Sequence, residues 1–318
     1  MVVNLHNDGV SLFLELCKKD AVSEFDIDLL LKNDSYSKAI ELMGSNWGIG
    51  LYDEWKKIFK AVFWRNEENL NKIQIQYINH IINAKDDYEK LINLSNRINN
   101  IIKSEEFVHI AKEYAFIDGL DSVDVYLLIF GPNAGGNQAI IIDVFFLEQF
   151  SDEEITRILA HELHHIIRSK HEVRYEVEPK YEDVLQMVYW FESEGIANLC
   201  NFEETSKLYE MFGYIEKDSM VHNLNNIDVI MKEINQLIID LYQNNKSELY
   251  QYLFENFKFH SIGYHMALTI FYFSQYALKS IVGDPLKFIN LYQVVCEFNE
   301  LKFSEESMKI INQILTEN

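Results

Sequence analysis

The stretch SDEEITRILAHELHHIIRSK, residues 151–170, has the pattern of a single amphipathic helix. Its apolar side chains recur every three or four positions, at Ile155, Ile158, Leu159, Leu163, Ile166 and Ile167. Ser151 and Glu154 have the spacing of a capping box, in which each side chain accepts a hydrogen bond from the backbone N–H of the other residue. We therefore expect the helix to begin directly after Ser151.

The same stretch contains His161-Glu162-Leu163-His164-His165, an HExxH arrangement. Residues four apart lie on nearly the same helix face, so His161 and His165 can bind one tetrahedral Zn²⁺. Glu162 lies one step around the helix, where a carboxylate can take a proton from an activated water and return it to a leaving amine. We expect an accidental match in roughly 3% of chains with this His and Glu content. His164 points away from His165, so we expect it to support the site or to lie at the surface.

A catalytic zinc site needs a third protein ligand and one position left open for water. His171 stands where the metzincin pattern HExxHxxGxxH has its third histidine, but Arg168 occupies the place of the glycine in that pattern. His171 is therefore a weak candidate for the third ligand.

Two better candidates lie in the segment FESEGIAN, residues 191–198, within a helix predicted from Tyr181 to Phe202. Glu192 and Glu194 are two residues apart, so they cannot share a helix face. We favour Glu194, because the small residues that follow it would let two helices approach closely at the metal. The alternative, in which both are solvated surface glutamates, stays open.

The HExxH motif and Glu194 with its Gly-Ile-Ala-Asn continuation resemble the gluzincins, the thermolysin-like group of zinc peptidases. The resemblance covers roughly Val123 to Asn198 and implies that Glu194 is the third zinc ligand. It also implies that the residue four later, usually Asp in that group, hydrogen-bonds a zinc-binding histidine. Here that residue is Asn198, whose side-chain oxygen can accept from an imidazole N–H but carries no charge.

Two segments upstream of the motif, Val123 to Phe130 and Ala139 to Phe146, are rich in β-branched and aromatic residues and predict strands. The glycine-rich stretch between them predicts a turn or loop, and it lacks the spacing of a phosphate-binding loop. In zincin-type peptidases the strand before the HExxH helix is a sheet edge that pairs with an extended substrate. We expect residues 137–142 to form that edge, with an ordinary core strand as the alternative. The candidate substrate-binding residues are Gly136, Asn137 and Ala139.

A further donor is needed to stabilise the oxyanion of an amide-hydrolysis intermediate. The segment FHSIGYH, residues 259–265, resembles the Gly-Tyr segment that follows the glutamate helix in small families of predicted zinc peptidases. Tyr264 is our first candidate for this donor and His260 the second. The alternative for Tyr264 is an ordinary place in the core.

Composition bounds the class of protein. Of the 318 residues 48% are hydrophobic, and the chain has only 3 prolines and 12 glycines, so long helices can form. The formal charge of −22 disfavours nucleic acid and anionic membranes as partners. Residues 1–18 lack a basic segment followed by an apolar one, and the three cysteines are far apart, so we expect a cytoplasmic protein.

We therefore predict a helix-dominated α+β fold: a helical N-terminal region, residues 1–105, and a zincin-like metallopeptidase domain, residues 106–318. That domain would hold the sheet and HExxH helix (118–170), the glutamate helix (181–202) and a helical C-terminal part (203–318). We expect one Zn²⁺ per chain and a peptide or protein substrate. The alternatives are a non-catalytic zinc-binding or partner-binding protein and a zinc-dependent hydrolase of a non-peptide amide.

Overall fold

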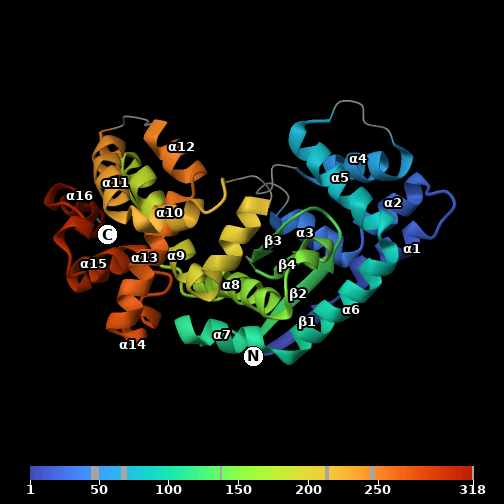
Figure 1. Cartoon of the computed structure of the whole chain (residues 1–318), viewed down its shortest axis with the longest axis horizontal. Coiled ribbons are helices and arrows are strands. Elements are labelled where there is room, and N and C mark those ends of the chain that lie inside the picture. Colours follow the sequence, from blue (N-terminus) through green and yellow to red (C-terminus); the bar gives the residue numbers. More distant parts are fainter. Residues whose placement is uncertain (44–49, 66–69, 137, 212–214, 244–247, 317–318) are drawn as a thin grey trace. The chain divides into compact units, whose positions relative to one another are not determined.

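The computed structural model describes the chain except residues 44–49, 66–69, 137, 212–214, 244–247 and 317–318. The described residues form two compact units, and Figure 1 labels their helices and strands in chain order. The first unit contains Met1–Phe107 and Leu120–Ile166, and the second contains Val108–Gly119 and Ile167–Asn318. Helices dominate and a small mixed sheet accompanies them, which confirms the predicted helix-dominated α+β class. The predicted domain boundary after residue 105 stays a prediction.

The first unit holds a four-stranded sheet in the order β1-β2-β4-β3. Its strands are β1 (Val2–His6), β2 (Ser122–Leu128), β3 (Ala134–Gly136) and β4 (Ile140–Asp143). The pairs β1–β2 and β2–β4 are parallel, whereas β3 runs antiparallel to β4. All four residues of β4 are buried, so this strand belongs to the core of the unit.

The sheet confirms one predicted strand and corrects the prediction of the edge. Val123 to Phe130 forms β2, but the second strand is short and ends before the 3₁₀ helix η1 (Phe145–Gln149). β4 pairs with β2 on one side and β3 on the other, so residues 137–142 are not the sheet edge. The edge strand is β3, inside the stretch predicted as a turn or loop. The structure also shows β1, a strand that the sequence analysis missed.

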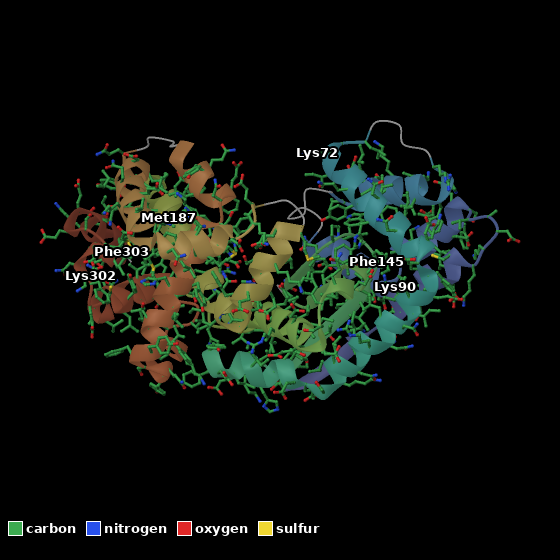
Figure 2. The ribbon with its side chains drawn as sticks, viewed as in Figure 1. Lys72, Lys90, Phe145, Met187, Lys302 and Phe303 are labelled. Carbon is green, nitrogen blue, oxygen red and sulfur yellow. The ribbon has the colours of Figure 1, made fainter. Side chains whose placement is uncertain are left out.

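Among the residues that the structure describes, six helices precede β2 in the first unit. They are α1 (Asp8–Cys17), α2 (Glu24–Leu31), α3 (Asp34–Met43), α4 (Tyr52–Trp64), α5 (Lys72–Asp86) and α6 (Tyr88–Ser104). Helices α1 and α3 pack against β2, and α6 packs against β1 and η1. Figure 2 labels Lys90 on α6, which pairs with Glu148 of η1, and Phe145 at the start of η1.

A buried carboxylate organises the chain where β2 and β4 end. Asp143 is completely buried and accepts backbone hydrogen bonds from Phe130, Gly131 and Phe146 at 2.7–2.9 Å. The Nε2 atom of His80 on α5 lies 2.8 Å from Asp143 Oδ1. These contacts satisfy a charged group that would otherwise be costly to bury, and they hold the segments that follow β2 and β4 in place.

The HExxH stretch forms α8 (Asp152–Lys170). The capping box is present: the backbone N–H of Ser151 donates to the Glu154 carboxylate at 2.6 Å, and the N–H of Glu154 donates to Ser151 Oγ at 3.2 Å. The predicted start of the helix is therefore confirmed. The first unit ends at Ile166, so the last turn of this continuous helix belongs to the second unit.

The second unit is built around α9 (Pro179–Met211) and α13 (Lys258–Phe273). Met187, labelled in Figure 2, is completely buried on α9, and the non-helical dihedral angles of Asn201 kink that helix. The two helices touch through glycines, because a Cβ on Gly195 would lie 2.8 Å from Gly263 Cα and closer still to its carbonyl group. Only glycine at both positions permits this approach.

Shorter elements complete the second unit. They are α10 (Ser219–Asn225), α11 (Ile227–Tyr242), α12 (Glu248–Glu255), α14 (Gln275–Lys279), α15 (Pro285–Val295), η2 (Asn299–Leu301) and α16 (Glu305–Thr316). Helix α7 (Glu106–Tyr114) begins at the boundary between the units. Within the part of the chain that the structure describes, no helix combines the length and the apolar character that crossing a membrane requires.

Candidate metal centre

Two imidazoles meet on one face of α8. The Nε2 atoms of His161 and His165 lie 3.1 Å apart, with the rings 4.8 Å apart and inclined by 78°. Two nitrogens that each lie about 2.0–2.1 Å from a tetrahedral Zn²⁺ would be about 3.3 Å from each other. The pair therefore fits a shared metal ion with little adjustment. His161 is only 7% exposed, so the surroundings already exclude most water.

The neighbours of this pair on α8 differ in their surroundings. His164 is completely buried, which excludes the surface position considered for it from the sequence. Glu162 is partly exposed, and its backbone faces the edge strand β3. A Cβ on Gly136 would lie 2.8 Å from the Glu162 carbonyl carbon and closer still to its oxygen, so this position requires glycine. The sheet edge thus runs directly beside the turn that carries the HExxH glutamate.

Of the other two candidate substrate-binding residues, the structure describes one. Ala139 is buried next to the start of β4, and Asn137 falls outside the described residues. Of the two candidates that the structure describes, Gly136 lies on the edge strand and Ala139 does not.

Glu194 lies in a polar cluster between α9 and α13. One of its carboxylate oxygens is 3.5 Å from His260 Nδ1, and both side chains are nearly buried. Asn198 Nδ2 lies 3.3 Å from the same His260 nitrogen, and Asn198 Oδ1 has no hydrogen-bond partner among the described residues. Asn198 therefore reaches Glu194 through His260.

The surroundings of the Glu194 carboxylate favour the binding of a cation. Burial raises the pKa of its carboxyl group to about 7, while the positive charge of Arg168 acts in the opposite direction. A carboxylate that is costly to ionise alone gains most from a cation beside it, and a metal supplies one. The donor chemistry therefore fits a divalent metal.

The competing carboxylate, Glu192, is already engaged. It is completely buried, accepts from Arg168 Nε at 2.5 Å and accepts from the backbone N–H of Gly283 at 2.8 Å. The idea that both glutamates are solvated is therefore wrong, because the Glu194 side chain is only 13% exposed. His171, the weak candidate for the third ligand, has its Nε2 atom 3.2 Å from the carbonyl oxygen of Phe116.

His161 and His165 belong to the first unit and Glu194 to the second, and each offers one atom that could bind a metal ion. We preferred Glu194 because the small residues that follow it would let two helices approach closely at the metal. That reason needs correction, because Gly195 makes room for the backbone of α13.

Tyr264 lies one turn beyond His260 on α13. Its ring stacks on Phe202 of α9 with centroids 4.2 Å apart and an interplanar angle of 20°. Burial raises the pKa of its phenol, so the hydroxyl keeps its proton at neutral pH. A protonated phenol is a hydrogen-bond donor, as the predicted role requires.

Two contributors to this arrangement were missed in the sequence. Arg168 was noted only as the residue that breaks the metzincin pattern, and Gly263 only as part of the Gly-Tyr segment. The roles of these two residues depend on their partners, since Arg168 pairs with Glu192 and Gly263 contacts Gly195. No spacing pattern in the sequence predicts either pair.

An HExxH helix, a nearly buried glutamate on the following helix and a helix-dominated α+β fold together define a candidate zinc-centre protein. The chain belongs to the family described as "Putative zinc dependent peptidase (DUF5700)", whose model matches residues 27–300. Neither the search of curated proteins nor the search of solved structures gave a match.

Proposed function

We propose that this protein is a zinc-dependent metallopeptidase of the gluzincin type with a zincin-like catalytic fold. His161, His165 and Glu194 would hold one Zn²⁺ per chain. The observation that carries the proposal is the pair of His161 and His165 Nε2 atoms 3.1 Å apart on α8, with Glu162 of the same HExxH motif next to the first of them. The description of the family agrees with it.

A zinc ion bound there would lower the pKa of water and polarise a carbonyl group. The chain's own residues would do the rest. Glu162 would accept the proton of the attacking water and deliver it to the leaving amine. Tyr264 would donate a hydrogen bond to the developing oxyanion, with His260 as the second candidate. The contact of His260 with Glu194 favours a supporting role, in which His260 and Asn198 hold the carboxylate in place.

We further propose that the substrate is an extended peptide or protein segment that adds to the sheet at β3. Among the described residues this strand has a partner strand on one side only, β4, and Gly136 brings it against the backbone of Glu162. Strand addition would therefore bring a scissile bond toward the general base. We also propose that the protein has no nucleic-acid or membrane partner, on the strength of the charge of −22. A cytoplasmic location is proposed because its three cysteines are far apart in the sequence, as in proteins of reducing compartments.

The test combines metal analysis with an unbiased peptide library. Protein purified without added zinc should contain about one zinc per chain, and His161→Ala should lose it. Glu162→Gln should keep the zinc but lose about 10²–10⁴-fold in turnover, because it removes only the proton acceptor. Glu153→Gln is the matched control, since Glu153 is an exposed glutamate on the same helix.

Each outcome decides between the functions considered. Absence of stoichiometric metal would refute the metal centre. Bound zinc with no peptide turnover in the wild type would favour a non-catalytic zinc protein or a hydrolase of another amide. Unchanged turnover in Glu162→Gln would refute the proposed mechanism.

A further inference from the structure

We propose that the buried ion pair between Arg168 and Glu192 is a positioning device for the metal centre. It would set the register of α9, the helix that carries Glu194, against the last turn of α8, the helix that carries both histidines. This inference rests on the proposed function, because it assigns the pair a role in holding the ligands of that same site.

The ion pair is unusually enclosed. Arg168 is 2% exposed and Glu192 is completely buried, with Arg168 Nε 2.5 Å from the Glu192 carboxylate. The guanidinium group also donates to Glu172 at 3.3 Å, and its centre lies 3.9 Å from the ring centroid of Tyr189. Three partners therefore fix the plane of the guanidinium group, which a flexible ammonium group could not match.

The carboxylate of Glu192 is fixed from its other side as well. Its second oxygen accepts from the backbone N–H of Gly283 at 2.8 Å. The carbonyl oxygen of Gly283 in turn accepts from the backbone N–H of Val173 at 2.8 Å. A Cβ on Gly283 would lie 2.5 Å from the His171 carbonyl oxygen, so the turn fits closely against the segment that follows α8. Glu192 is thus held between the end of α8 and the turn before α15.

The ion pair can affect the metal site because Arg168 and Glu192 lie close in sequence to the proposed ligands. Arg168 follows His165 by three residues on α8, and Glu192 precedes Glu194 by two residues on α9. A slip of one residue would move a ligand by about 1.5 Å along its helix and rotate it by about 100°. Metal–ligand distances tolerate only about 0.2 Å, so the metal site requires the register that this pair sets.

General stability is a poor explanation for the pair. Burying two charges is expensive, and well-packed apolar residues of similar volume often stabilise a protein as much or more. The charged pair instead adds a fixed geometry. The planar guanidinium and carboxylate groups bond at one distance and orientation, so they allow one arrangement of α8 and α9. This difference separates a positioning role from a structural one.

The test compares three variants with the wild type. The double variant Arg168→Met/Glu192→Gln removes both charges, keeps similar volumes and retains a side-chain oxygen at position 192 that can accept from the N–H of Gly283. Arg168→Lys keeps the charge but loses the planar fork. Glu233→Gln is the control, because Glu233 forms an ion pair with Lys258 at 2.8 Å on other helices of the same unit. For each protein we would measure zinc affinity by chelator competition, the melting temperature without metal, and kcat and KM.

We expect the double variant to bind zinc about 10–100-fold more weakly, as other changes behind metal ligands do. Its kcat should fall more than its KM changes, and its metal-free melting temperature should stay close to that of the wild type. Arg168→Lys should show a smaller loss in the same direction, and Glu233→Gln should match the wild type.

Wild-type zinc affinity and kcat in a folded double variant would overturn the inference while leaving the proposed function intact. If the double variant does not fold, Arg168→Lys decides, because unchanged zinc affinity there would equally overturn it. A wild-type protein that binds no zinc would instead refute the proposed function.

Discussion

Gly195→Ala is a substitution whose effect the structure fixes in sign as well as in size. The added Cβ would lie 2.8 Å from Gly263 Cα and closer still to the carbonyl group of that residue. Ordinary contact begins at 3.4 Å, so the backbones of α9 and α13 must separate by at least about 0.6 Å. The obstacle is backbone, which cannot rotate away as a side chain could.

The cost follows from two opposed effects. Overpacking a tightly fitted contact typically costs about 1–3 kcal/mol, and a backbone clash belongs at or above the upper end. Replacing a helical glycine by alanine contributes about 1 kcal/mol in the other direction through helix propensity. We expect a net loss of about 2 kcal/mol in the free energy of unfolding. For a folded unit of this size, that lowers the melting temperature by about 4–8 °C.

The assay is urea and thermal unfolding of the metal-free protein, with Gln186→Ala as a control at an exposed position of α9. Gly263→Ala should also destabilise, because its Cβ would lie 2.5 Å from the Phe191 carbonyl oxygen. The double variant should lose less than the sum of the two, since either change separates the same pair of helices. A Gly195→Ala protein more stable than the wild type would show that helix propensity alone operates, and would refute the close contact.

Three further predictions concern other parts of the chain. Asp143→Asn should lower the free energy of unfolding by about 3 kcal/mol, measured by urea denaturation, because buried N–H groups of Phe130, Gly131 and Phe146 lose a charged acceptor. Tyr264→Phe should lower kcat by up to about 10²-fold in steady-state assays with little change in KM; an equal kcat would exclude the hydroxyl as an oxyanion donor. Zinc affinity should rise with pH through about 7, where the raised pKa of Glu194 lies, because the carboxyl group must lose its proton before it binds metal. Chelator titrations from about pH 6 to about pH 8 check this, and a flat profile would contradict it.

The sequence predicted best where local pattern decides structure. The capping box and the periodic apolar stripe fix α8 without help from distant residues, and the spacing of His161 and His165 alone brings their imidazoles together. The β-branched residues of β2 likewise predict a strand from the local sequence.

What the sequence did not reveal depends on partners far along the chain. β3 contains two glycines and no strand-favouring residue, so its pairing with β4 is what makes it a strand. β1 became recognisable only beside β2, where Val2 stands opposite Ser122. The distinct environments of Glu192 and Glu194 likewise depend on Arg168 and Gly283, which no helical periodicity could supply.

The position of β1 has a practical consequence for producing this protein in pieces. The family match begins at residue 27, whereas β1 occupies residues 2–6 and pairs along the whole of its length with β2. A chain trimmed to residues 27–300 would keep every candidate ligand and yet leave one edge of β2 with open N–H and C=O groups. Open edges of this kind recruit strands from other molecules and promote aggregation. Insolubility of such a fragment would therefore report the packing that β2 loses, β1 beside it and α1 against it, and would carry no information about the metal centre.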